Sequence, residues 1–159
     1  MICEKINFKF GLPFKISLNS LSQKKTFNRS FKLLWVLKGK ISFKNNNFKT
    51  ETDKIIDLKA GEIQIINSYT PFKLLKESDN SRYIILDFKN IYLKKSSFNL
   101  QKKIYNIKSQ DDLNDLKYLI AQLARDYFKF DYKLAEKVKP DLDKLLLELN
   151  KNYCIYNQR

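Results

Sequence analysis

The hydrophobic pattern of this chain changes its period once, between residues 94 and 109, and this change constrains the fold more than any other feature. Before it, apolar and polar residues alternate in short runs, as in residues 14–18 (FKISL), which is typical of half-buried strands. After it, apolar residues recur three and four positions apart, which is typical of amphipathic helices. The pattern therefore predicts a mainly β fold with a C-terminal α part.

Short strands separated by turn residues fill the first ninety residues. Their spacing, a turn about every 8–12 residues, is typical of a sandwich or barrel. Asn45, Asn46 and Asn47 predict a hairpin turn, since asparagine tolerates the left-handed conformation. The predicted strands lie at 5–10, 14–18, 31–37, 41–43, 48–52, 55–58, 63–66, 72–75 and 83–88.

Two helices are predicted after residue 109. Ser109 and Asp112 resemble a capping box at the start of the first helix, which ends near 131–132. The second spans 133–153, and Pro140 predicts a kink or a restart there. The apolar stripe of the first helix fits two roles: it covers the sheet, or it forms a dimer seam. Its residues are Leu113, Leu116, Ile120, Leu123 and Tyr127.

Length and composition favour one domain in three parts. The 159 residues are 43% hydrophobic, enough for a single core. We expect a β part at 1–93 whose residues 1–13 form an N-terminal arm, a connector at 94–108 and a two-helix part at 109–155. No run reaches the ~20 apolar residues of a membrane helix, and no signal peptide is evident. Because Cys3 and Cys154 suggest no disulfide framework, we expect a cytoplasmic protein.

The net charge of +14 is concentrated in the first fifty residues, where Glu4 is the single acidic residue. Such a charge is compatible with binding to nucleic acid or an anionic ligand. It is also compatible with biased amino-acid usage, because only four of the 31 basic residues are arginines, the residue that base and phosphate recognition favours. A basic β-barrel that binds single-stranded nucleic acid directly through Phe-rich strands is the alternative function.

Several kinds of catalytic chemistry have no support in the sequence. The chain contains no histidine, which removes the usual nucleophile pairs and most transition-metal sites. Its three glycines, Gly11, Gly39 and Gly61, are isolated and form no phosphate-binding loop. From these absences we expect no catalytic residues, no metal and no cofactor, and a chain that is not an enzyme.

Three segments resemble the N-terminal cupin domain of AraC-type transcriptional regulators: 33–39 (LLWVLKG), 58–72 (LKAGEIQIINSYTPF) and 83–88 (YIILDF). With the helix pair, the resemblance spans 25–155. It implies a cupin-like double-stranded β-helix, or jelly-roll, barrel followed by two antiparallel helices. It also implies an effector-sensing domain that forms homodimers through the helical region. DNA would be bound only by a helix-turn-helix half that this chain lacks.

The same resemblance implies a pocket without a metal. The positions of the family's metal ligands hold Thr26, Asn28, Lys32 and Phe72, and a lysine ammonium repels a cation. A cupin enzyme such as an isomerase is disfavoured for this reason. If Lys32 points into the barrel, strand alternation places Trp35 against the helices.

Five residues are candidates for binding a small anionic or polyhydroxy effector. A buried Lys32 must be paired, shifted in pKa or bound to an anion, unless its ammonium reaches solvent at the barrel mouth. The effector would act by favouring one arrangement of the arm and helices. The candidates are Thr26, Asn28, Lys32, Gln64 and Phe72.

Overall fold

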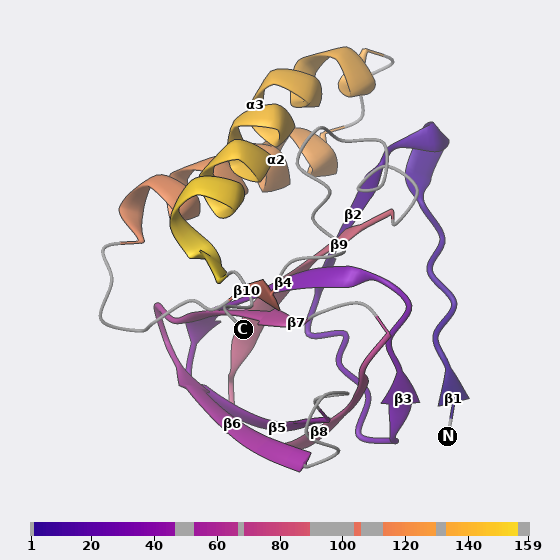
Figure 1. The fold of residues 1–159 in the computed structure, drawn as a ribbon, viewed down its shortest axis with the longest axis vertical. Helices are drawn as coiled ribbons and strands as arrows, with labels where there is room; N and C mark the ends of the chain where they lie inside the picture. Colours follow the sequence, from indigo (N-terminus) through magenta and orange to yellow (C-terminus); the bar gives the residue numbers. More distant parts are fainter. Residues whose placement is uncertain are drawn as a thin grey trace.

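Three layers make up the protein in the computed structural model: a five-stranded sheet, a four-stranded sheet above it, and two helices on the outer face of the second sheet (Figure 1). The structure describes residues 2–46, 53–66, 69–89, 104–105, 113–129 and 133–155. No helix among these residues has the length and apolar character needed to cross a bilayer.

The strands of the two sheets alternate along the chain. The five-stranded sheet has the order β1-β3-β8-β5-β6, and the four-stranded sheet has the order β2-β9-β4-β7. Within them only β1 and β3 pair in parallel. The strands are β1 (Ile2–Cys3), β2 (Phe14–Leu18), β3 (Thr26–Phe27), β4 (Phe31–Lys38), β5 (Lys40–Asn46), β6 (Asp53–Lys59), β7 (Ile63–Ile66), β8 (Pro71–Glu77) and β9 (Arg82–Phe88).

The predicted architecture is confirmed in its main outline and corrected in its closure. The chain is mostly β with two helices at the C-terminal side, as expected. The closed jelly-roll barrel is not found, because the described strands β1 to β9 pair within two separate sheets and none of them pairs across from one sheet to the other. Edge strands β6 and β7 each have one described neighbour, which leaves a sandwich.

The N-terminal arm is less regular than its alternation predicts. In place of a strand at 5–10, only β1 is extended and paired, and Lys9–Gly11 forms a short 3-10 helix, η1. Ile6 and Phe8 are nevertheless half-buried. Alternation in the arm therefore reflects one-sided packing without a neighbouring strand to complete a ladder.

The predicted asparagine turn is also displaced. Asn45 and Asn46 are the last residues of β5 and pair with β6. Asn47 and the predicted strand at 48–52 lie outside the described residues.

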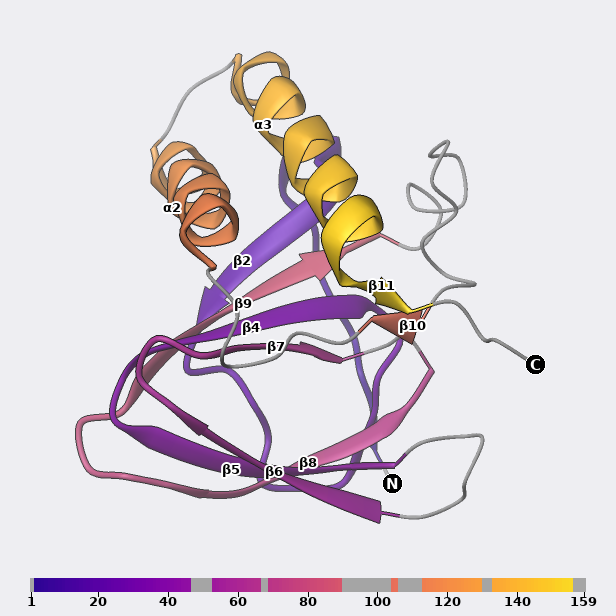
Figure 2. The same ribbon diagram turned by 60° about the vertical axis from the view of Figure 1, so that its left-hand side comes forward.

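β4 lies between the helices and the five-stranded sheet (Figure 2), and its alternate side chains belong to two different layers of the core. Leu33 packs in the cluster between the four-stranded sheet and the helices, and Trp35 is partly buried against that cluster. Leu34 and Val36 pack in the cluster between the two sheets. The predicted strand alternation is therefore confirmed.

Two glycines allow tight turns beside β4. Gly39, between β4 and β5, has φ of 78°, and Gly61, between β6 and β7, has φ of 92°. A Cβ on Gly39 would clash with Ser78 Oγ and lie 3.0 Å from Ser81 Cα. Position 39 thus requires a glycine for two reasons: its φ is positive, and the β8–β9 connection leaves no room for a Cβ.

The helical layer consists of α2 (Asn114–Phe128) and α3 (Leu134–Glu148), followed by a π-helix, η3 (Leu149–Tyr153). α3 continues through Pro140, so the second helix does not restart there. The predicted capping residues at 109–112 lie outside the described residues. In the predicted connector, β10 (Ile104–Tyr105) pairs with β11 (Cys154–Ile155).

Candidate functional site

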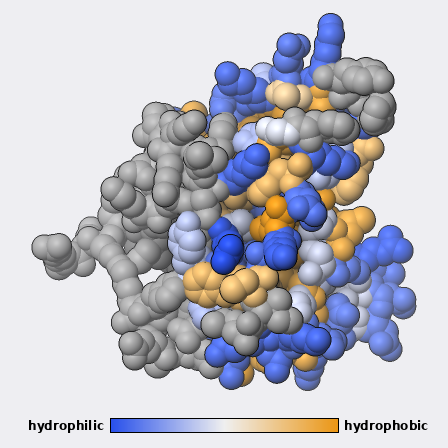
Figure 3. All heavy atoms as spheres, turned by 90° about the vertical axis from the view of Figure 1, so that its right-hand side faces the viewer, coloured by the Kyte–Doolittle hydropathy of each residue, from blue (hydrophilic) through white to orange (hydrophobic). Residues whose placement is uncertain are grey.

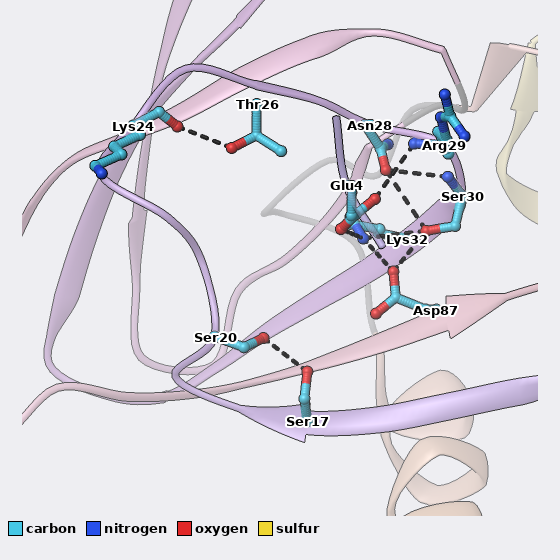
Figure 4. Close-up of polar contacts among 10 residues, drawn as sticks. All are labelled: Glu4, Ser17, Ser20, Lys24, Thr26, Asn28, Arg29, Ser30, Lys32 and Asp87. Carbon is cyan, nitrogen blue, oxygen red and sulfur yellow. Dashed lines mark hydrogen bonds and ion pairs between the residues drawn. The ribbon is translucent and has the colours of Figure 1, made fainter. Parts of the chain in front are cut away.

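An ionic cluster lies at one end of the layer between the two sheets, where Lys32 of β4 is only 2% exposed. Its ammonium contacts the carboxylate of Asp87, and it also donates to Glu4 Oε1 at 2.6 Å and to Ser30 Oγ at 3.0 Å. These side chains converge in Figure 4. A buried ammonium needs such partners, because burial without them carries a large desolvation penalty.

Strand register brings Lys32 and Asp87 together. The two residues are direct cross-strand partners in the antiparallel β4–β9 pair. Lys32 shares its strand face with Leu34, and Asp87 shares its face with Ile85, both in the cluster between the sheets. Opposite charges at directly opposed positions stabilise such a pair.

Ser30 adds a hydrogen bond to the same carboxylate oxygen of Asp87 that the Lys32 ammonium contacts. Ser30 donates to Asp87 Oδ1 at 2.6 Å, and Asn28 Oδ1 accepts from the Ser30 amide at 3.1 Å. Asn28 and Ser30 are buried. The polar chain therefore continues from the ion pair into the segment between β3 and β4.

The arm supplies the third charge. Glu4 follows β1, and while Oε1 accepts from Lys32, Oε2 accepts from the Arg29 amide at 3.2 Å. Ammonium and amide together form a cradle around one carboxylate group. The Glu4 side chain keeps 16% of its surface exposed, so it is the most accessible of the three charged groups.

A cavity of about 250 Å³ lies beside this cluster. Thr26, Lys32 and Phe72 all line it, together with Glu4 and Asp87. Lys32 Nζ lies 5.9 Å from the Phe72 ring centroid. The cavity thus has a charged end and an apolar wall, and its apolar wall is formed by Leu21, Phe72 and Ile85.

The five predicted ligand-binding residues are brought together only in part. Thr26 and Phe72 are cross-strand partners and border the cavity with Lys32. Asn28 lies one hydrogen bond away, behind Ser30. Gln64 lies in β7 opposite Leu34, and its amide donates to Ile65 O, so it does not line this cavity.

Thr26 already has a partner. Its hydroxyl donates to Lys24 O at 2.9 Å and points away from the ionic cluster (Figure 4). One of the alternatives for Lys32 is also decided, because its ammonium is paired inside the protein and does not extend to solvent.

Sequence reasoning missed three members of the cluster. Asp87 was visible in principle, since it is the one charged residue in an otherwise apolar strand, YIILDF, and shares the register of Lys32. Glu4 carried a weaker signal as the only acid among the first fifty residues. Ser30 carried none, because a serine near a strand end is common in any turn.

The predicted dimer stripe is buried within one chain. Its side chains are at most 4% exposed and pack on the four-stranded sheet and α3. This is the intramolecular role that the pattern also allowed, and dimerisation stays a prediction. The residues are Leu113, Leu116, Ile120, Leu123 and Tyr127.

Three of the described phenylalanines in the basic first segment are not available for stacking on bases. Phe14, Phe31 and Phe43 are at most 1% exposed, whereas stacking on bases requires an accessible ring face. Hydrophilic and hydrophobic residues are interspersed over the face seen in Figure 3. These observations give no support to the alternative of direct single-stranded nucleic-acid binding.

A larger cavity of about 430 Å³ lies elsewhere, lined by residues of β5, β6 and β8 and by Glu62. Its polar side chains are mostly exposed, and Ser42 donates to Asp57 there at 2.6 Å. It contains no buried charge comparable to Lys32. Among the described residues, no group of three or more His, Cys, Asp or Glu side chains could hold a metal ion.

No protein-family model matches the chain, and no curated protein matches it. Several solved structures are similar to part of it. A crystal structure of Fe(II)-HppE with the alternative substrate (S)-1-HPP is 19% identical, with a TM-score of 0.31, over 46% of this chain and 34% of that one. Oxalate decarboxylase from Bacillus subtilis is 10% identical, with a TM-score of 0.42, over 57% of this chain and 28% of that one. Drosophila melanogaster CENP-C bound to CAL1 is 14% identical, with a TM-score of 0.40, over 50% of this chain and 63% of that one.

The comparison corrects one expectation. HppE and oxalate decarboxylase are cupin-fold enzymes, which contradicts the exclusion of enzymes drawn from the sequence, and that exclusion is withdrawn. The chain spans about a third of the HppE chain and less than a third of the decarboxylase chain. At such identities no activity passes from them to this chain.

Proposed function

We propose that this chain is the effector-sensing part of an AraC-like transcriptional regulator, in which a small molecule binds between the two sheets. The observation that carries the proposal is the buried ammonium of Lys32 beside a cavity with an apolar wall. Ligand sites combine such walls with a few fixed polar groups. The resemblance of residues 25–155 to regulator cupin domains supplies the functional class.

The arm and the helices are the elements through which binding would be transmitted. Residues of the arm line the cavity, and Lys9 Nζ lies 4.4 Å from the Tyr127 ring centroid, so the arm also contacts α2. A ligand shifts an equilibrium between two arm arrangements only by its different affinity for them. In this proposal the regulator acts in the cytoplasm as a homodimer, and a domain outside this chain contacts DNA.

Ligand-dependent stabilisation tests the proposal. Wild-type protein is heated with single members of a panel of anionic metabolites and neutral polyols, and its unfolding midpoint is recorded. A ligand at a hundred times its Kd stabilises the fold by about 2.7 kcal/mol. The paired variant K32M/D87L should lose this response to the same ligand.

A control separates the rival function. Anisotropy of labelled single-stranded DNA is measured against salt concentration for the chain alone. Tight binding with a log–log slope of about −4 or steeper would favour direct nucleic-acid binding. A ligand that stabilises wild type and K32M/D87L equally would place binding outside the proposed cavity and contradict the proposal.

A further inference from the structure

Glu4 occupies its cradle in the manner of a bound carboxylate ligand. One oxygen accepts from Lys32 Nζ at 2.6 Å and the other from the Arg29 amide at 3.2 Å. Two donors on two oxygens are what a free carboxylate requires of a binding site. The carboxylate that fills this site belongs to the N-terminal arm, 28 residues from Lys32 in sequence.

One carboxylate, that of Glu4, lies beside the buried pair of Lys32 and Asp87. Lys32 and Asp87 carry opposite charges that offset each other, and both are nearly inaccessible to solvent. Glu4 adds one negative charge at the accessible side. If the arm leaves, a single carboxylate restores the arrangement of charges that exists with Glu4 bound, whereas a neutral acceptor offers the Lys32 ammonium a weaker hydrogen bond without a counter-charge.

The arm is held weakly around Glu4. β1 and β3 share two residue pairs, against seven between β4 and β9, and the Glu4 amide donates to Phe27 O at the long distance of 3.4 Å. Few buried contacts and few ladder bonds characterise segments that open locally.

Cavities adjoin this part of the arm on two sides. Residues 4–6 border the 250 Å³ cavity and also a second cavity of about 420 Å³ that Arg29 and Phe88 help to line. By contrast, Leu12 is buried in the core and Lys89 Nζ lies 5.2 Å from the Phe8 ring centroid. The arm can therefore release residues 2–7 while residues 8–12 stay anchored.

We propose that the cavity binds a small monocarboxylate with an apolar tail, and that Glu4 is an internal competitor for its carboxylate position. The ligand carboxylate takes the place of Glu4 at Lys32 and the Arg29 amide, and its tail lies against Phe72 and Ile85. Binding displaces the front of the arm. This inference rests on the proposed function, and it adds the ligand class and the way in which the arm responds.

Pentanoate is the probe, and pentanamide, its neutral counterpart of similar shape, is the control ligand. Affinity is measured by calorimetry for wild type, E4Q and E136Q, the last changing an exposed glutamate of α3. E4Q should bind pentanoate on the order of tenfold more tightly than wild type, because it removes a competitor from the competent state. E136Q should equal wild type, and pentanamide should bind all three weakly.

Limited trypsin cleavage after Lys5 reports directly whether the front of the arm is displaced. Pentanoate should accelerate cleavage there in wild type, and E4Q should be cleaved fast with or without pentanoate. Equal pentanoate affinity in E4Q and wild type, or slower cleavage with pentanoate, would overturn the inference. A neutral polyol that stabilises wild type while pentanoate fails in E4Q would overturn it too and leave the proposed function standing.

Discussion

The two faces of β4 differ in what they bury. Toward the helices, Phe31 and Leu33 pack against apolar side chains of α2 and α3. Toward the other sheet, Leu34 and Val36 meet apolar side chains, but Lys32 meets two carboxylates and a hydroxyl. The helix side contributes stability alone, whereas the side between the sheets gives up apolar packing at one end for an ionic cluster and a cavity. We therefore expect function at Lys32, because it is a charged residue on a strand face that is otherwise apolar.

The largest expected effect on stability comes from removing one charge of the ionic cluster. D87L should lower the free energy of unfolding by about 3–5 kcal/mol, because it leaves the Lys32 ammonium buried with only Glu4 as a counter-charge. Urea unfolding followed by circular dichroism measures it. K32M/D87L should recover most of this loss, since both fully buried charges are removed and the remaining carboxylate, Glu4, has access to solvent. A double variant as unstable as D87L would show that the cluster stabilises through packing and not through charge.

Truncating a buried side chain in the layer between β4 and the helices should lower the free energy of unfolding slightly less than D87L does. L116A removes a fully buried side chain of α2 and should lower the free energy of unfolding by about 3 kcal/mol through the cavity it leaves. Y118A, at a position that is 64% exposed on the same helix, should change it by less than about 0.5 kcal/mol. Unlike D87L, L116A has no charged partner whose removal restores stability. Pentanoate binding by folded L116A should be unchanged.

The smallest expected effect is a loss of stability at high pH, to which one buried tyrosine in each layer contributes. Burial raises the pKa of Tyr83, in the layer between the sheets, and of Tyr127, in the helix layer, above the ordinary value of 10.0. Because the folded state holds these phenol protons more tightly, stability is unaffected below pH 10 and falls as pH rises beyond it.

Phenylalanine variants show which tyrosine causes this loss of stability at high pH. Y83F and Y127F should each flatten the fall in the urea midpoint between pH 9 and about 11.5, and Y118F, at a position that is 64% exposed, is the control variant. A midpoint that falls equally steeply in all three variants would show that neither buried phenol is responsible.

The sequence predicts the helix side of β4 better than the side between the two sheets. The alternation of residues 31–36 predicted correctly which side chains of β4 face the helices, because a period of two has one solution when both faces are buried. The helix stripe was also recognisable, although its burial within one chain required the sheet to be placed first. The open edges of the two sheets were not recoverable from the pattern, since alternation indicates strands and not which edges pair.

The site was less predictable because it joins segments far apart in sequence. β3 has two residues, Thr26 and Phe27, too few for any period to show. Register between β4 and β9 decides that Asp87 lies opposite Lys32, and no local signal fixes that register. The position of Glu4 depends on how an irregular arm crosses the sheet edge, which composition cannot indicate.

The pairing of β4 with β9 also bears on how the chain reaches its native state. Lys32 and Asp87 are 55 residues apart, so the central ladder can form only after a long loop containing β5 to β8 has closed. Such non-local pairing slows folding. Until the ladder forms, both charges stay hydrated, and the desolvation of Lys32 then coincides with strand docking. We therefore expect the folding barrier to include the dehydration of this ion pair, with the arm and Glu4 joining last.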